Sequence, residues 1–528
     1  MQHYRMKSRL MLLCALVCAL VCVAALRVAW AGGGLLNNSF GSGGKVSMQL
    51  TGTNDYVQTV VTQPDGRIVG VGTAGSSPLV VRFLSNGQLD SGFGSGGIFI
   101  PTPLTIARGL ALQADGKILV AGSAPDSGGL YGLAVARLNS NGSLDTGFGH
   151  SGVSQPQVFN GRGDYATSIA IQPDGKIVLA GIAGIAYQDS DFAVARYNSD
   201  GSPDTSFGTG GQAHTSFGDS RDQAYAVAIQ ADGKILVSGD GTVSNYEVDF
   251  ALARYNANGT PDTAFDGDGK LTTRFFFQNF ARAYALKIQP DGKILAAGSA
   301  GVIGDYRFGL ARYNADGSAD QSFGTSGVQT LTFPGYARAD GNAVALQADG
   351  RIIVGGDAFS YSEDYNFALA RFTSNGQLDT SFGNAGRVTT NFGAEDVAYA
   401  MSLQSNGTIL LAGQTGQYPD YAIALASYTN DAAVRRSVVA DYDGDGTSDL
   451  SVFRPDGGMW FLSQSTGGFR AQAWGASGDV LVPADYDGDG KTDVAVFRQG
   501  NWYILKSTDG TLRAQSFGQS GDVAVPGD

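Results

Sequence analysis

Residues 347–391 read QADGRIIVGGDAFSYSEDYNFALARFTSNGQLDTSFGNAGRVTTN, and this stretch decides the fold because close copies of it run along most of the chain. Short runs of β-branched and aromatic residues between glycine-containing turns predict strands and not helices. Asp349-Gly350 is predicted to form a two-residue hairpin turn in which both residues need a positive φ. With the residues just before it, the stretch predicts four strands: Ala343–Gln347, Arg351–Gly355, Phe367–Phe372 and Gly386–Asn391.

One phrase of this unit recurs seven times, at intervals of 50 to 59 residues. Its copies begin at Gln63, Gln113, Gln172, Gln230, Gln289, Gln347 and Gln404. A second phrase, ARYNSDGSPDTSFG at residues 195–208, has counterparts in phase in the neighbouring copies. The repetition predicts an all-β fold, a seven-bladed β-propeller of four-stranded blades over residues 32–429. A β-solenoid is the alternative, but its coils are usually much shorter than these units.

The count of strands predicts how the propeller closes. Lys45–Leu50 resembles a fourth strand but precedes every complete set, and the last set ends near Tyr428 without a fourth strand. Pairing Lys45–Leu50 with Tyr421–Tyr428 would close the ring and remove its exposed edges. The recurrent aspartate of the second phrase is predicted to cap its own turn. Its copies include Asp145, Asp204, Asp262 and Asp379.

Both phrases resemble the delta-60 repeat proteins of bacteria, which are exported tandem repeats of roughly 60 residues with propeller-like predicted folds. The resemblance covers residues 36–429 and rests on the two phrases recurring in phase. It implies a fold and an exported protein more than a particular activity.

A different repeat begins near residue 430, with DYDGDGTSD from Asp441 and DYDGDGKTD from Asp485. Alternating aspartates turn their carboxylates to one side of a tight loop, and such oxygen ligands suit Ca²⁺ better than Mg²⁺, which prefers stricter geometry and retained waters. The predicted carboxylate ligands are Asp441, Asp443, Asp445 and Asp449 in one loop and Asp485, Asp487, Asp489 and Asp493 in the other. Thr447 and Lys491 are predicted to add backbone carbonyls. A pair of acidic surface turns is the alternative.

These loops and their flanking segments resemble FG-GAP/VCBS-type repeats, as in integrin-like propellers, where such a loop joins two strands. The resemblance implies calcium-binding repeats over residues 430–528. Two copies are followed by the start of a third, in which Asp528 aligns with Asp485.

The first 31 residues are predicted to be a signal peptide. Arg5, Lys7 and Arg9 precede an uncharged run from Leu10 to Leu26, and Ala29-Trp30-Ala31 predicts cleavage after Ala31. An uncleaved anchor is the alternative, because the run is only just long enough to span a bilayer. All three cysteines, Cys14, Cys18 and Cys22, lie in this segment, so the mature chain would have neither disulfides nor thiolate sites.

Charge and motifs narrow the function. The net charge of −13 disfavours nucleic acid as a partner. Beyond the signal segment only His150 and His214 remain, in different repeats, and neither a nucleophile motif nor a phosphate-binding loop is found, so we predict no catalytic and no cofactor-binding residues.

The loops between second and third strands differ most among the copies, and variable loops on a rigid scaffold are where ligands usually bind; unselected surface variation is the alternative. They contain Tyr187, Tyr246, Tyr306, Tyr361, Tyr365 and Tyr418. The sequence predicts an exported or periplasmic binding or scaffold protein with a protein or polysaccharide ligand, without a transmembrane segment after cleavage. A secreted propeller hydrolase or lyase acting on polysaccharide or peptide is the alternative.

Overall fold

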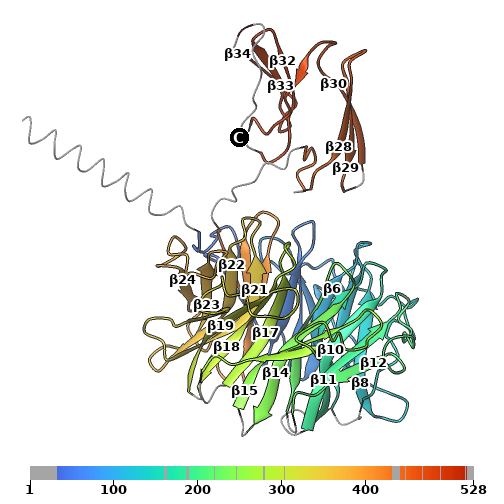
Figure 1. The fold of residues 1–528 in the computed structure, drawn as a ribbon, viewed down its shortest axis with the longest axis vertical. Helices are drawn as coiled ribbons and strands as arrows, with labels where there is room; N and C mark the ends of the chain where they lie inside the picture. Colours follow the sequence, from blue (N-terminus) through green and yellow to red (C-terminus); the bar gives the residue numbers. More distant parts are fainter. Residues whose placement is uncertain are drawn as a thin grey trace, which may run out of the picture. The chain divides into compact units, whose positions relative to one another are not determined.

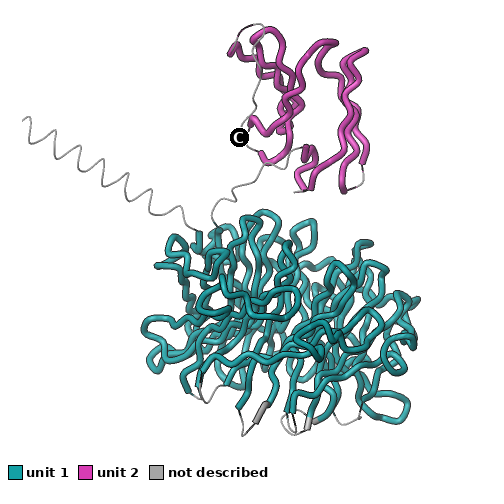
Figure 2. Tube along the Cα trace, viewed as in Figure 1, with its two compact units in different colours: residues 1–431 teal, residues 432–528 magenta. Residues whose placement is uncertain are grey.

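The computed structural model describes most of the chain in two compact units, residues 1–431 and residues 432–528 (Figure 2). The described residues are 33–159, 163–185, 189–218, 221–244, 247–276, 280–302, 304–430, 440–445, 447–466, 468–487, 489–517 and 519. The predicted signal peptide, its cleavage site and the three cysteines lie outside these residues. Within the described ranges, no helix has the length and apolar character needed to cross a membrane.

The first unit is built from antiparallel sheets that follow one another along the chain (Figure 1). The first three repeats form β2 (Tyr56–Thr62), β3 (Ile68–Ala74), β4 (Ser77–Phe83) and β5 (Ile98–Phe99); β6 (Ile106–Leu112), β7 (Ile118–Pro125) and β8 (Tyr131–Leu138); and β9 (Tyr165–Ile171), β10 (Ile177–Ile185), β11 (Asp189–Tyr197) and β12 (Gln212–Thr215). The fourth and fifth form β13 (Gln223–Ile229), β14 (Ile235–Ser244), β15 (Glu247–Tyr255) and β16 (Lys270–Thr273), then β17 (Phe280–Ile288), β18 (Ile294–Val302), β19 (Asp305–Tyr313) and β20 (Val328–Leu331). These two sheets join through one parallel bridge, Val248 to Phe280.

The remaining repeats complete the unit. They form β21 (Arg338–Leu346), β22 (Ile352–Ser360), β23 (Asp364–Phe372) and β24 (Arg387–Thr390), followed by β25 (Val397–Leu403), β26 (Ile409–Thr415) and β27 (Ala422–Tyr428). The predicted all-β propeller class is confirmed, and the four strands predicted around residue 347 correspond to β21–β24.

The predicted geometry of the Asp349-Gly350 turn was wrong. Gly350 has a φ of +84°, but Asp349 does not have a positive φ. Gly350 N–H donates to Gln347 C=O and Gln347 N–H donates to Arg351 C=O, both at 2.9 Å, so the loop has three residues and only the glycine is left-handed. The Asp349 side chain accepts a hydrogen bond from Arg351 N–H at 3.0 Å, and this bond stabilises the turn.

The second repeat lacks a regular fourth strand in the described residues. Its place is taken by isolated bridges, Val153 with Ala136 and Gln157 with Leu133. Pro156 lies between the two bridges and has no N–H to donate to a ladder, which explains the interruption.

The closing strand is confirmed. β1 (Lys45–Met48) pairs antiparallel with β27, Val46 lying opposite Leu425. One apolar core contains residues of the first and last repeats, among them Val57 and Leu410. Elsewhere the cores lie between consecutive sheets, as in the cluster that joins Phe308 with Ile352. The sheets therefore pack face to face and the ends of the repeat array meet.

The second phrase folds into a contact between neighbouring sheets, here called the arginine clamp. In the third repeat, Arg196 Nε lies 2.7 Å from Asp204 Oδ2, and its guanidinium lies 4.7 Å from the centre of the Phe207 ring. The same guanidinium donates to the backbone carbonyl of Ala257 in the next repeat. Equivalent clamps form at Arg82, Arg137, Arg254, Arg312 and Arg371. As predicted, the aspartate also caps its turn, with Ser206 N–H donating to Asp204 Oδ1 at 3.1 Å.

The second unit contains two small sheets. One is β28 (Leu450–Arg454), β29 (Met459–Gln464) and β30 (Gly468–Ala473), and the other is β31 (Val480–Leu481), β32 (Val494–Arg498), β33 (Asn501–Leu505) and β34 (Leu512–Ser516). Trp460 is buried between them against Val494 and Val496. Trp460 Nε1 donates to the carbonyl of Trp474, so both indoles serve packing within the unit.

Candidate functional site

The first strand of each repeat carries a β-bulge at the same place. The register against the second strand shifts there, which adds one side chain to one face of the strand. The bulge residue lies five positions before the recurrent glutamine. In chain order the bulge residues are Gln58, Arg108, Thr167, Tyr225, Tyr284, Asn342 and Tyr399.

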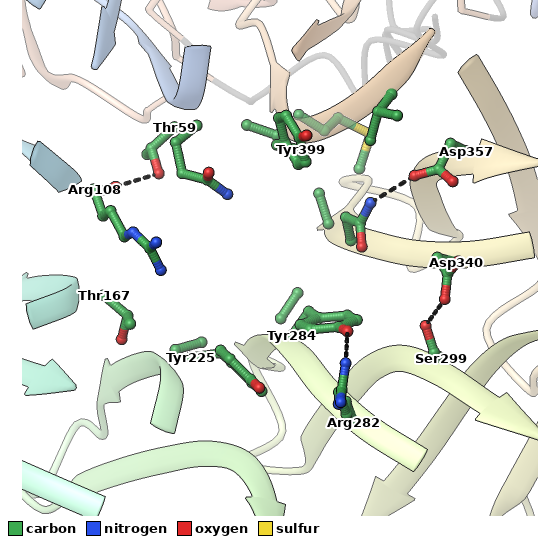
Figure 3. A pocket seen from close by; sticks show the side chains of 18 of the residues that line it. Thr59, Arg108, Thr167, Tyr225, Arg282, Tyr284, Ser299, Asp340, Asp357 and Tyr399 are labelled. Atoms are coloured by element: carbon green, nitrogen blue, oxygen red, sulfur yellow. Dashed lines mark hydrogen bonds between the residues drawn. The ribbon is translucent and has the colours of Figure 1, made fainter. Parts of the chain in front are cut away.

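All seven bulge residues line a single cavity of about 1100 Å³, here called the channel (Figure 3). The next residue in each repeat is small and also lines the channel: Thr59, Gly109, Ser168, Ala226, Ala285, Ala343 and Ala400. The residue after that is aliphatic: Val60, Leu110, Ile169, Val227, Leu286, Val344 and Met401. The channel lining thus consists of a ring of chemically different side chains, followed by a ring of small side chains and a ring of aliphatic ones.

The wall formed by β13, β14 and β17 holds a connected polar network. Tyr225 Oη donates to Gln223 Oε1 at 2.8 Å, and the two rings of Tyr225 and Tyr284 lie 4.9 Å apart. Arg282 donates to the Tyr284 hydroxyl at 3.3 Å and lies 3.4 Å from the buried carboxylate of Asp240. These contacts fix both tyrosines in place.

Two carboxyl groups face each other across β21 and β22, because Asp340 and Asp357 are register partners. Ser299 Oγ donates to Asp340, and Asn342 Nδ2 donates to Asp357 at 2.9 Å (Figure 3). Burial raises the pKa of both carboxyls, and for Asp357 the neighbouring charge of Asp340 raises it further, to well above its ordinary value.

Arg108 lies on the wall of the channel formed by β6 and extends into the cavity (Figure 3). Its guanidinium lies 4.7 Å from the centre of the Tyr165 ring. It has no carboxylate partner among the described residues, unlike each of the clamp arginines. On the neighbouring strand β2, the side chains of Tyr56 and Gln58 also have no hydrogen-bond partner among the described residues. This wall therefore presents half-buried polar side chains to the cavity that are available to bond a ligand.

The predicted loop tyrosines only partly belong to the channel. Tyr306, Tyr365 and Tyr418 line it, whereas Tyr361 is 89% exposed and lines a separate hollow. The predicted residues Tyr187 and Tyr246 lie outside the described residues.

Sequence reasoning missed the ring of bulge residues, although a signal for it exists. The position five residues before each recurrent glutamine changes chemical type from copy to copy, while its neighbours stay small or aliphatic. Only the bulge shows that this position faces the channel.

The predicted metal loops lie in the second unit. Oxygens of Asp441, Asp443 and Asp449 lie within 4.8 Å of one another. The second loop brings together Asp485, Asp487 and Asp493 in the same way. Oxygens on opposite sides of a calcium ion, each at about 2.4 Å, lie about 4.8 Å apart. Each carboxylate trio therefore fits one calcium ion.

The other predicted ligands are placed differently. Asp445 and Asp489 do not join the trios; Ser465 Oγ donates to Asp445 at 2.6 Å, and Ser507 Oγ donates to Asp489 at 3.0 Å. Thr447 and Lys491 donate their backbone N–H groups to these same carboxylates, at 2.7 Å and 2.8 Å. Their carbonyls remain predicted ligands.

Comparison with solved structures returns propellers of low similarity. A protein of unknown function from Dyadobacter fermentans is 12% identical, with 73% of this chain and 98% of that chain covered and a TM-score of 0.39. A virginiamycin B lyase from Staphylococcus aureus is 11% identical, with 72% and 98% covered and a TM-score of 0.40. An ulvan lyase, a polysaccharide lyase, is 13% identical, with 72% and 95% covered and a TM-score of 0.43. These values carry no argument about activity.

No curated protein matches the chain at a significant level. The family model described as "Domain of unknown function (DUF5122) beta-propeller" matches residues 63–93, 113–148, 172–207, 230–265, 289–323 and 347–382. A second model, described as "FG-GAP-like repeat", matches residues 441–496. The chain therefore carries DUF5122 β-propeller repeats between residues 63 and 382 and an FG-GAP-like repeat at residues 441–496.

Proposed function

We propose that this is an exported binding protein whose propeller holds an extracellular ligand, protein or polysaccharide, in the channel and its tyrosine-lined mouth. The observation that carries the proposal is the ring of bulge residues. The bulge and the small and aliphatic residues that follow it repeat from copy to copy, but the bulge side chain itself changes between amide, guanidinium, hydroxyl and phenol. A purely structural channel has no need of seven positions with such different chemistry.

The aromatic and polar side chains that line the channel favour a ligand-binding site over a cavity that holds only water. Aromatic side chains supply large contact area at a low cost in conformational entropy, and a few fixed polar groups give specificity. Tyr56 and Tyr399 form a second aromatic pair, with ring centres 5.8 Å apart. With about 1100 Å³, the cavity is slightly larger than the usual range of ligand sites, about 300–1,000 Å³.

The proposal includes the binding of calcium ions by the second unit. The two carboxylate trios are made of oxygen donors alone, and without a cation their like charges repel one another. Asp441, Asp443 and Asp449 would hold one ion and Asp485, Asp487 and Asp493 the other, which would stiffen the second unit.

The enzyme alternative draws no support from a particular site. His150 and His214 are both exposed and lie in different repeats, away from the channel lining. We therefore assign no catalytic residue.

The test is a binding screen of the full chain against arrays of extracellular polysaccharides and peptides, followed by titration of the hits. Tyr284→Ala should weaken binding at least about tenfold, because it removes a stacking surface that buried aromatic residues provide at binding sites. Tyr361→Ala is the matched control, since this exposed tyrosine lies on a loop outside the channel. Equal losses in the two variants, or binding that survives Tyr284→Ala and Tyr399→Ala together, would contradict a site in the channel.

A further inference from the structure

The channel has two chemically different walls. On the side of β13 to β25 three tyrosine hydroxyls are paired within the protein: Tyr225 with Gln223, Tyr284 with Arg282, and Tyr399 with Gln414 at 3.1 Å. On the side of β2 and β6, the half-buried side chains of Tyr56, Gln58 and Arg108 have no hydrogen-bond partner among the described residues. These side chains are available to hydrogen-bond a ligand in the channel.

Arg108 determines the charge of that ligand. A half-buried guanidinium loses part of its hydration and regains stability from an anionic partner, with which it forms two parallel hydrogen bonds when that partner is planar. Its fork of donors matches a carboxylate. Every clamp arginine has such a partner within the chain, whereas Arg108 faces the cavity without one.

The carboxyl groups of the channel do not supply this partner. Asp340 and Asp357 are engaged with Ser299 and Asn342 on the opposite part of the wall. Glu395 accepts a hydrogen bond from the Tyr421 hydroxyl at 2.9 Å.

The aromatic pairs determine the rest of the ligand. Tyr225 with Tyr284 and Tyr56 with Tyr399 offer flat apolar surfaces on two parts of the ring. A pyranose ring has apolar C–H faces that pack on such surfaces and hydroxyls at its rim that pair with amides and phenols. With about 1100 Å³, the channel has room for more than one sugar ring.

Resting on the proposed binding function, we infer that the ligand of the channel is an acidic oligosaccharide, with a sugar carboxylate on Arg108 and sugar rings packed on the tyrosine pairs. Gln58 and the Tyr56 hydroxyl bind the hydroxyls next to that carboxylate. A peptide ligand is the competing outcome.

The test uses isothermal titration of the full chain with trimers of galacturonate, mannuronate and glucuronate, each compared with its carboxyl-reduced, neutral twin. At least one acidic trimer should bind about tenfold or more tightly than its twin, the difference that one charge-assisted contact supplies. Arg108→Gln should remove this preference while leaving the neutral twin unaffected. Arg513→Gln, an exposed arginine of the second unit, is the charge-matched control and should change neither affinity.

The outcomes separate the two proposals. If a neutral twin binds as tightly as its acid and Tyr284→Ala weakens both, the channel is a binding site but the inference of an acidic ligand is wrong. Peptide binding that depends on Tyr284 also overturns the inference and leaves the binding function intact. If no saccharide and no peptide binds in a way that depends on the channel tyrosines, both proposals are wrong.

Discussion

The aspartate of each arginine clamp forms an ion pair with the clamp arginine where two repeats meet. Asp204 and Arg196 are both nearly buried, with 7% and 6% of their side chains exposed. Burial alone would raise the pKa of Asp204, but hydrogen bonds from Ser206 and Lys176 outweigh it and hold the pKa well below its ordinary value. A carboxyl whose pKa is lowered by folding stabilises the fold above its unfolded pKa of about 3.8, and that contribution is lost as the pH falls through the folded pKa.

We expect Asp204→Asn to lower the free energy of unfolding of the propeller unit by about 3 kcal/mol at pH 7, because it leaves a buried guanidinium without its counter-ion. Below about pH 4 the difference from the unmodified protein should narrow, because the carboxyl then binds a proton in the unfolded state while it stays ionised in the folded state. Denaturant titrations at pH 7, 5, 4 and 3 measure both effects.

Asp174→Asn is the matched control for this variant. Asp174 is exposed in a hairpin turn, and Asn406 stands at the equivalent place of the last repeat. Its free energy of unfolding should change by less than about 0.5 kcal/mol. A loss at Asp204 no larger than at Asp174 would show that the clamp does not stabilise the contact between repeats.

At the scale of elements, β1 is the strand on which closure depends, and its two faces differ. Val46 and Met48 pack against the core shared by the first and last repeats, whereas Ser47 is exposed. The alternation follows from the pleat of a strand that has one face on a core.

Val46→Asp should therefore destabilise the propeller by about 2 kcal/mol and broaden its unfolding transition, because it places a charge against the closing core. Ser47→Asp adds the same charge on the exposed face and should have almost no effect. Thermal unfolding followed by circular dichroism compares the two. Equal stability of both variants, or an unchanged transition after deletion of residues 32–52, would show that closure by β1 contributes nothing.

At the scale of the whole molecule, the two compact units have separate cores, so calcium should act on one of them alone. At an affinity of ~0.1 mM, ~1 mM calcium stabilises the second unit by about 1.4 kcal/mol per site by mass action. Calorimetry should show the transition of residues 432–528 rising with calcium while the propeller transition stays in place. Asp443→Ala should reduce the rise, and Asp456→Ala, an exposed aspartate outside both trios, should not.

The sequence predicts this molecule well wherever a feature repeats. The strands of each unit, the closing pair of β1 with β27 and the turn-capping aspartates could all be located from phrases in phase. The bulge at Tyr284 could not, since a single extra residue in a strand leaves no mark in composition or periodicity. Asp445 illustrates another limit: spacing gives it the same role as Asp443, but its oxygen accepts a hydrogen bond from Ser465, in the turn after β29, which spacing alone does not reveal.

The pairing of β1 with β27 also determines how late in translation the propeller ring can close. A chain that leaves the ribosome N-terminus first carries β1 without its neighbour until residue 428 has been made, so the ring stays open through nearly the whole of translation of the repeats. Contacts between such distant segments form slowly because a long loop must close first. During that interval β1 is an unpaired strand, and a chaperone that covers such strands would protect the nascent protein from association with other chains.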